Sequence, residues 1–214
     1  MKTTAQMQIW AGEFGKEYTD RNQASLKDMY SQNIELHGKT NLAIYQEALK
    51  NIDRDARILE IGCNIGNQLM CLQDAGFKNL YGIELQWYAV GKSKNFIKGV
   101  HIIQGTGFDL PFKDSCFDLI YTYGVLIHIS PKDLSTIFSE AYRCTKKYVM
   151  GFEYHDQELK QLNYRGEKNL LWKTDYSKAY QDHHPDLKEV FGKEYPVFSE
   201  PNNVDRIFLL AKEG

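Results

Sequence analysis

Apolar residues recur along this chain at two different spacings, and the spacing changes near residue 57. Before that point they recur every three or four positions, which is the period of an amphipathic helix. The pattern predicts helices over residues 5–20, 23–36 and 40–51, with Thr40 as the N-cap of the third. Residues 1–54 are therefore expected to form a helical cover.

From Arg57 onward, short β-prone runs alternate with helical or loop segments. The runs are RILEI, NLYGIEL, VHIIQG, FDLIYTY and KYVMGFEY. Connections of crossover length between them predict a parallel sheet. Gly76 is expected to end the helix after the first run, and Ser130-Pro131 to begin a helix over 131–145.

The last quarter of the chain has a different character. Residues 155–192 form a polar, aromatic excursion, and residues 193–214 read as two strands around a Glu-Pro-Asn-Asn turn. We expect this pair to close the sheet in antiparallel fashion. The whole chain, 1–214, is predicted to be a single α/β domain with its ligand-binding core over 55–154.

Composition narrows the class of protein. Lys and Arg number 26 against 28 Asp and Glu, giving a net charge of −2 without a basic arm, so nucleic acid is not expected as a partner. The start lacks the apolar stretch of a signal peptide, and no run approaches the length that spans a bilayer, so we expect no membrane association and a cytoplasmic location. The four cysteines show no metal-ligand spacing, which predicts free, mostly buried thiols and no metal site.

Candidate chemistry gathers in the loop after the first predicted strand. Gly62 and Gly66 allow the backbone to approach a ligand closely, and Asn64 between them tolerates a left-handed conformation. Glu84 ends the second strand at about the spacing where an acidic side chain accepts hydrogen bonds from ribose hydroxyls. The alternative interpretation is an ordinary strand-to-helix turn.

The acidic residue before this loop bears on the kind of ligand. The dinucleotide pattern G-x-G-x-x-G fits poorly, since only one of its three glycines is present, which disfavours a nicotinamide oxidoreductase. Glu60, two residues before Gly62, suits a cationic or neutral ligand better than a pyrophosphate. S-adenosylmethionine, with a sulfonium, an ammonium and a ribose but no phosphate, is such a ligand.

Residues 57–154 resemble the class I S-adenosylmethionine-dependent methyltransferases, whose first motif is similar to E/D-x-G-x-G-x-G. The stretch GTGFDLPFKDSCFDLIYTYGVLIHIS is similar to the later motifs of that family. The resemblance implies a Rossmann-like, seven-stranded, mostly parallel sheet with an antiparallel last strand and an N-terminal helical lid. The cofactor-binding residues that it implies are Arg21, Glu60, Gly62, Asn64, Gly66, Asn67, Glu84, Leu85, Thr106, Gly107, Phe108 and Tyr123.

Two positions depart from the family pattern. Asn64 replaces the middle glycine, and Thr106 stands where many members carry an Asp that accepts from the adenine amino group. The adenine contact is therefore expected from the backbone or from Gly107 and Phe108.

Two further segments, IWAGEFGKEYTDRN and YRGEKNLLWKTDYSKAYQDHHPDLKEV, resemble a smaller family of methylases associated with pseudaminic acid biosynthesis. This resemblance implies a bacterial surface-sugar setting. Fold-mates differ freely in acceptor, so a pathway association is weak evidence for a substrate.

Tyr18 and His128 are the candidate catalytic residues. His128 follows the fourth strand, where acceptors lie in this family, and its near-neutral pKa would suit a general base; a structural histidine is the alternative. Tyr18 lies in the expected lid together with Arg21, which could bind the methionine carboxylate or belong to a solvated helix face.

The excursion contributes aromatic residues and an arginine that could line an acceptor pocket. Tyr154, Tyr164 and Arg165 are the substrate candidates, because rings stack on sugar faces and Arg binds anionic groups. Ordinary surface or core packing is the alternative for each of them.

The expected function is methylation of a small molecule, either O- or N-methylation of a sugar, a nucleotide sugar or another surface-glycan precursor. The alternatives are methylation of a small phosphate or phosphoramidate-type glycan precursor, and a protein that binds S-adenosylmethionine without catalysis. The sequence leaves the use of a general base and the oligomeric state open.

Overall fold

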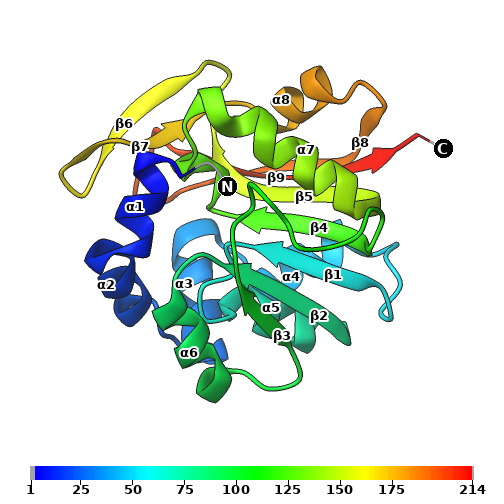
Figure 1. Ribbon diagram of the computed structural model, residues 1–214, viewed down its shortest axis with the longest axis horizontal. Coiled ribbons are helices and arrows are strands. Elements are labelled where there is room, and N and C mark those ends of the chain that lie inside the picture. The colour runs from blue at the N-terminus through cyan, green and yellow to red at the C-terminus, as the bar shows by residue number, and fades with distance from the viewer. Residues whose placement is uncertain (1–2, 214) are drawn as a thin grey trace.

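The computed structural model describes residues 3–213 and is built around a seven-stranded sheet (Figure 1). The strand order is β3-β2-β1-β4-β5-β9-β8. The strands are β1 (Arg57–Ile61), β2 (Asn79–Glu84), β3 (His101–Gln104), β4 (Phe117–Tyr123), β5 (Thr145–His155), β8 (Leu187–Pro196) and β9 (Val204–Lys212). Strands β1 to β5 pair in parallel, whereas β9 runs antiparallel to both β5 and β8. The predicted fold class is confirmed.

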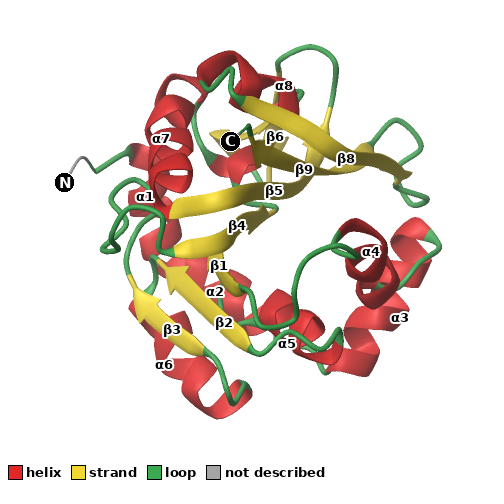
Figure 2. Cartoon of the chain, turned by 90° about the vertical axis from the view of Figure 1, so that its right-hand side faces the viewer, coloured by secondary structure: helices red, strands yellow, loops and turns green. Residues whose placement is uncertain are grey.

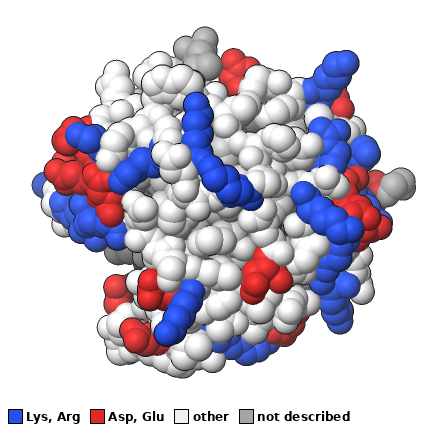
Figure 3. Space-filling view, turned by 90° about the horizontal axis from the view of Figure 1, so that it is seen from below, with Lys and Arg blue, Asp and Glu red and all other residues white. Residues whose placement is uncertain are grey.

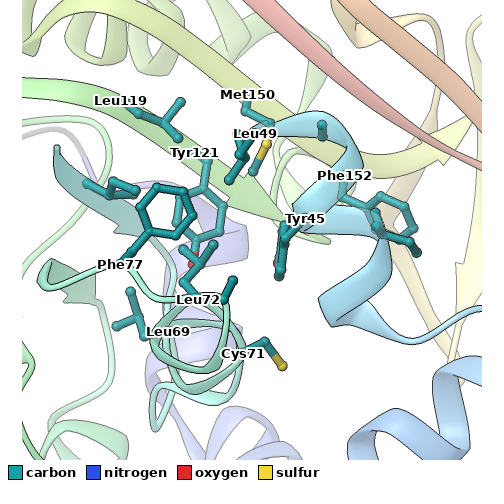
Figure 4. Close-up of a cluster of buried hydrophobic side chains, with 14 of the residues drawn as sticks. Tyr45, Leu49, Leu69, Cys71, Leu72, Phe77, Leu119, Tyr121, Met150 and Phe152 are labelled. Carbon is teal, nitrogen blue, oxygen red and sulfur yellow. The ribbon is translucent and has the colours of Figure 1, made fainter. Parts of the chain in front are cut away.

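Helices cover both faces of the sheet (Figure 2). α3 (Leu26–His37), α4 (Asn41–Ala48) and α5 (Asn67–Asp74) share one buried apolar cluster, in which Tyr45, Leu72 and Phe77 surround Tyr121 of β4 (Figure 4). α7 (Leu134–Cys144) and α8 (Tyr176–His183) cover the other cluster. α6 (Trp87–Phe96) packs beside β2 and β3. Burial of these apolar side chains is the main force that holds the layers together.

The N-terminal cover differs from the expectation of one helix over 5–20. It consists of α1 (Ala5–Ala11) and α2 (Glu13–Arg21), separated by Gly12 in an extended conformation. A Cβ on Gly15 would lie 1.9 Å from the Trp10 carbonyl oxygen, so the two helices meet at a corner that only glycine permits. The expectation was wrong because two nearby glycines allow this sharp turn.

Most other predicted helix ends are confirmed. The Thr40 hydroxyl accepts from the Ala43 amide at 3.1 Å and caps α4, and Gly76, with φ of 92°, follows the end of α5. The helix expected over 131–145 begins as a short 3-10 helix, η2 (Pro131–Asp133), before α7. Ser130 precedes it but its side chain makes no capping bond.

The aromatic excursion contains elements that the sequence did not predict. β6 (Lys160–Tyr164) and β7 (Glu167–Lys173) form a hairpin beside α1 (Figure 1), and Gln6 donates to the Asn169 carbonyl across that contact at 2.9 Å. Helix α8 follows, and β8 starts at Leu187 rather than at the expected position 193. The hairpin thus brings a late segment against the N-terminal cover.

Charge and cysteine placement agree with the composition. On the face in Figure 3, Lys and Arg side chains alternate with Asp and Glu around a largely uncharged middle. All four cysteines are free, and Cys63, Cys71 and Cys144 are buried, as predicted. Within residues 3–213, the helices are all too short or too polar to cross a membrane.

Candidate functional site

A cavity of about 510 Å³ lies where β1, β2 and β4 end, under the cover formed by α1 and α2. This is the edge at which open α/β sheets bind ligands. The predicted site residues that line it are Tyr18, Arg21, Glu60, Gly62, Asn64, Asn67, Glu84, Leu85, Thr106, Gly107, Phe108, Tyr123 and His128. The structure therefore brings together residues from five separate stretches of sequence.

The loop after β1 is left-handed at three positions. Gly62, Asn64 and Gly66 have φ of 73°, 49° and 97°, so Asn64 does adopt the conformation expected of it. A Cβ on Gly62 would lie 2.7 Å from a Val125 methyl carbon. Gly62 therefore permits close packing of the loop against Val125 as well as approach of a ligand. Gly66 is not among the residues that line the cavity, and a Cβ there would lie 3.0 Å from an Ile97 methyl carbon.

Glu84 organises this loop. Its carboxylate accepts from the Asn64 amide at 2.9 Å and from the Gln86 amide at 2.8 Å. Burial raises the pKa of Glu84, while these backbone donors oppose the shift. A carboxylate offers about four lone-pair sites, so capacity remains for the ribose hydroxyls. The ribose role of Glu84 stays a prediction.

Glu60 is a second acidic group in the same cavity. It is 2% exposed, and its Oε2 accepts from the Tyr121 hydroxyl at 2.8 Å. Burial, followed by the nearby charge of Glu84, raises the pKa of Glu60 to about 8, against the opposing bond from Tyr121. At neutral pH Glu60 is therefore largely protonated in the free protein, and a ligand that carries positive charge would favour its ionised form.

The cover is attached by the side-chain amides of Asn64 and Asn67, both predicted site residues, and of Gln86, which the sequence did not single out. Buried Gln86 donates to the carbonyl oxygens of Gly12 at 2.9 Å and Trp10 at 3.2 Å. The Asn64 amide donates to the Thr19 hydroxyl at 3.0 Å, and Asn67 donates to the Asn22 carbonyl at 2.7 Å. The position of Gln86 just beyond Glu84 is the only sequence signal that could have indicated this attachment.

The two catalytic candidates line the cavity, and both have shifted pKa values. Burial raises the pKa of Tyr18 to about 12, with Tyr164 and Glu84 adding to the shift. Burial lowers the pKa of His128 to about 4. The His128 Nδ1 lies 2.7 Å from the Leu170 carbonyl oxygen, so Nδ1 carries the proton of the neutral ring and Nε2 is the free acceptor. With these pKa values His128 is a weak base at neutral pH and Tyr18 keeps its own proton. The catalytic role of each stays a prediction.

The substrate candidates lie beside the cavity rather than in it. Tyr164 packs against His128 at a centroid distance of 4.8 Å and against Trp10 at 6.4 Å. Arg165 lies in the hairpin turn with φ of 51°, and Tyr154 is half-buried on β5. Of the described residues that line the cavity, none is Tyr154, Tyr164 or Arg165. Their role in acceptor binding stays a prediction.

Glu153 is an acidic residue that sequence reasoning missed. It is buried at the end of β5 and accepts from the amides of Val125 at 3.2 Å and Ile127 at 3.4 Å. These amides belong to η1 (Leu126–His128) and the residue before it. Burial raises the pKa of Glu153 to about 7. Glu153 thus fixes the turn that carries His128.

Thr106, which replaces the Asp of the family pattern, forms a hydrogen bond within its own loop. It is buried, and its hydroxyl accepts from the Phe108 amide at 3.2 Å. This bond shapes the loop of Gly107 and Phe108, which borders the cavity beside Leu85. The adenine contacts remain predictions.

Residues 59–151 match the family model described as a methyltransferase domain. Over those residues the chain is similar to methyltransferase domains. An uncharacterized methyltransferase of Synechocystis is 29% identical over 104 residues, which is 48% of this chain and 49% of that protein. The chain spans about half or less of the length of the curated relatives it matches.

Solved structures share the fold of the matched residues and of the elements that flank them. The 1,6-didemethyltoxoflavin-N1-methyltransferase of Burkholderia thailandensis, solved with S-adenosylhomocysteine, aligns over 100% of this chain and 93% of its own with a TM-score of 0.70 and 14% identity. The magnesium protoporphyrin IX methyltransferase of Synechocystis, also solved with S-adenosylhomocysteine, aligns over 97% and 98% with a TM-score of 0.67 and 13% identity. These likenesses extend the Rossmann-like methyltransferase fold to the whole chain.

Proposed function

We propose that the protein is an S-adenosylmethionine-dependent methyltransferase that acts on a small-molecule acceptor. The observation that carries the proposal is the pairing of Glu60 and Glu84 in one cavity with the loop of Gly62 and Asn64. The two acids suit a sulfonium and an ammonium and oppose a pyrophosphate, which favours this cofactor over a dinucleotide.

Different residues of the cavity would bind different groups of the cofactor. Glu84 would accept from the ribose hydroxyls, Arg21 would bind the carboxylate of the methionine part, and Glu60 would face its positive charge. When bound, the cofactor would supply a methyl group on a sulfonium, which is already a reactive leaving group. The protein then needs chiefly to position the acceptor and exclude water, and the α1–α2 cover is placed to do both.

For the acceptor we propose a sugar, a nucleotide sugar or another surface-glycan precursor, methylated on oxygen or nitrogen. The support is the resemblance to methylases associated with pseudaminic acid biosynthesis and the aromatic excursion near His128. A cytoplasmic location and the absence of a nucleic acid partner remain predictions from composition.

A small phosphate or phosphoramidate-type glycan precursor is the alternative acceptor. Tyr18 and His128 are both neutral at neutral pH, and neither is well suited to take a proton. An anionic oxygen has no proton to lose, so it would need no base. A protein that binds the cofactor without transferring the methyl group is the remaining alternative.

Isothermal calorimetry with S-adenosylmethionine, S-adenosylhomocysteine and NAD tests the cofactor. We expect selective binding of the first two, and Glu84→Ala should weaken that binding by about tenfold or more, because both the loop and the ribose contact are lost. Asp109→Ala, an exposed acid in the neighbouring loop, is the control. Binding of NAD, or unchanged affinity in Glu84→Ala, would contradict the assignment.

Transfer is tested separately by incubating sugar-nucleotide and sugar-phosphate extracts with protein and cofactor and following them by mass spectrometry. A mass increase of one CH₂ on a sugar acceptor is the expected result. Cofactor binding without any new methylated product would favour the non-catalytic alternative.

A further inference from the structure

One wall of the cavity carries several side-chain amides, with Met29 and Leu36 of α3 as apolar neighbours. Helix α3 presents Gln32 and Asn33 to the cavity, α4 begins at Asn41, and α5 contributes Gln68. We call these four residues the amide wall. The cavity-lining residues of α3 recur at positions 29, 32, 33 and 36, which is one face of a helix. The wall is therefore a continuous surface rather than scattered residues.

The hydrogen bonds of the amide wall leave acceptor capacity unused. Gln68 Oε1 accepts from Asn41 Nδ2 at 3.3 Å and from the Tyr45 hydroxyl at 2.8 Å. Asn33 Nδ2 donates to the Lys39 carbonyl at 2.8 Å. Asn41 is only 4% exposed, and its Oδ1 is buried with no partner among residues 3–213. An unpaired buried oxygen is unfavourable, so a ligand that donates a hydrogen bond to it would recover free energy.

The wall also lacks charge. Among the described residues that line the cavity from α3, α4 and α5, none is ionisable. The amino-acid end of S-adenosylmethionine carries a carboxylate and an ammonium, and each needs an opposite charge. We expect Arg21, and Glu60 once the bound cofactor favours its ionised form, to supply these charges elsewhere in the cavity. The amide wall is therefore left for the second reactant.

We propose that the amide wall binds the hydroxyl and amide groups of an uncharged acceptor, such as a neutral sugar. The wall runs from buried Asn41, whose side chain also contacts the Tyr123 phenol, to exposed Gln32 at its outer end. An acceptor on it would meet neutral donors and acceptors along its length and would lie against the end of β4. This inference rests on the proposed function, since the acceptor is defined by methyl transfer.

The test uses three sugars of similar size with isotope-labelled protein, with and without S-adenosylhomocysteine. N-acetyl-D-glucosamine is neutral, D-glucosamine is a cation and D-glucuronate is an anion. We expect the neutral sugar to shift the side-chain amide signals of Asn41 and Gln68 in nuclear magnetic resonance spectra. Asn41→Leu and Gln32→Ala should each weaken its binding by about five-fold, the value of one hydrogen bond. Gln46→Leu, an exposed amide on the outer side of α4, should leave it unchanged.

The affinity for S-adenosylhomocysteine separates this proposal from the proposed function. We expect it to change by less than about two-fold in Asn41→Leu. A loss of about tenfold would assign the wall to the cofactor and overturn the proposal. Preference for a charged sugar, or no shift with any of the three at about 50 mM, would also overturn it. Failure of the wild-type protein to bind S-adenosylhomocysteine would instead refute the proposed function. The exposed position of Gln32 keeps the test valid if Asn41→Leu does not fold.

Discussion

At the scale of single residues, Gly62 is constrained by its backbone and by its neighbour. Its φ of 73° is strained for any residue with a Cβ, and that Cβ would lie 2.7 Å from Val125. We expect Gly62→Ala to lower the free energy of unfolding by about 2–4 kcal/mol, from the left-handed conformation and the overpacking together. Urea unfolding followed by circular dichroism measures the loss.

The two causes can be separated by adding Val125→Ala to Gly62→Ala. Removing the methyl groups of Val125 should relieve the overpacking but not the backbone strain, so the double variant should be more stable than the sum of the single changes predicts. Strict additivity would show that Val125 is not the group that excludes a side chain at this position.

His128 gives a second prediction at this scale. Burial lowers its pKa to about 4, and Leu170 accepts from Nδ1. We expect the ring to remain neutral at pH 5.5 with its proton on Nδ1. Long-range proton–nitrogen spectra report the tautomer and the titration directly. A His128 pKa near 6.5 would instead favour a role as general base.

At the scale of elements, the α1–α2 cover is held by few bonds and should open as a unit. Gln86 supplies two of these bonds, to Trp10 and Gly12. We expect Gln86→Ala to speed hydrogen exchange of amides in residues 5–21 by about tenfold and to raise the dissociation rate of the cofactor. Gln104→Ala is the control, because its bond to the Leu85 carbonyl lies on the exposed surface. Equal exchange in the two variants would show that the cover is held by packing alone.

Some helices, strands and turns could be predicted from the sequence, and others could not. The alternation of strands and crossovers predicted the parallel sheet, and Asn64 indicated a left-handed position, because both are local properties. The corner at Gly12 was missed because the helical period continues through it, and tertiary packing decides where the turn falls. The β6–β7 hairpin was missed because its residues are mostly polar and it packs on α1, which lies far away in sequence.

At the scale of the whole molecule, the order and direction of the strands determine where the cavity lies. Residues of the cavity were predicted where they follow strand ends, since parallel strands end at one edge of the sheet. The amide wall and Glu153 were not predicted, because a buried amide or acid has no sequence pattern that distinguishes it from an exposed one. Trp10, His128 and Tyr164 meet only through the fold, within 6.4 Å of one another by ring centroid.

The buried acids also give the whole protein an unusual dependence of stability on pH. Burial raises the pKa of Glu60 to about 8 and that of Glu153 to about 7. In the unfolded chain both acids lose their protons near pH 4.5, so the folded state binds more protons between that pH and the raised values. Stability therefore falls as pH rises through this range. The lowered pKa values of His128 and His184 act in the opposite direction, but only below about pH 6.5.

In the window from pH 6.5 to 8 the two histidines no longer oppose the acids, and any part of the Glu84 titration that falls within it acts in the same direction. At 1.36 kcal/mol per proton and pH unit, we expect the free energy of unfolding to fall by about 2–3 kcal/mol across it, most of it from Glu60. Glu60→Gln, which keeps an acceptor for the Tyr121 hydroxyl, should remove most of this slope, and Glu153→Gln should remove the smaller part near pH 7.

Saturating S-adenosylmethionine should flatten the slope in the wild-type protein, because its positive charge stabilises ionised Glu60. The affinity for S-adenosylmethionine should rise over the same window. Urea unfolding at several pH values, with and without cofactor, measures all of these quantities. A wild-type stability that is constant or rising between pH 6.5 and 8 would mean that Glu60 is ionised in the free protein, and the cavity would then present a fixed negative charge to its ligand.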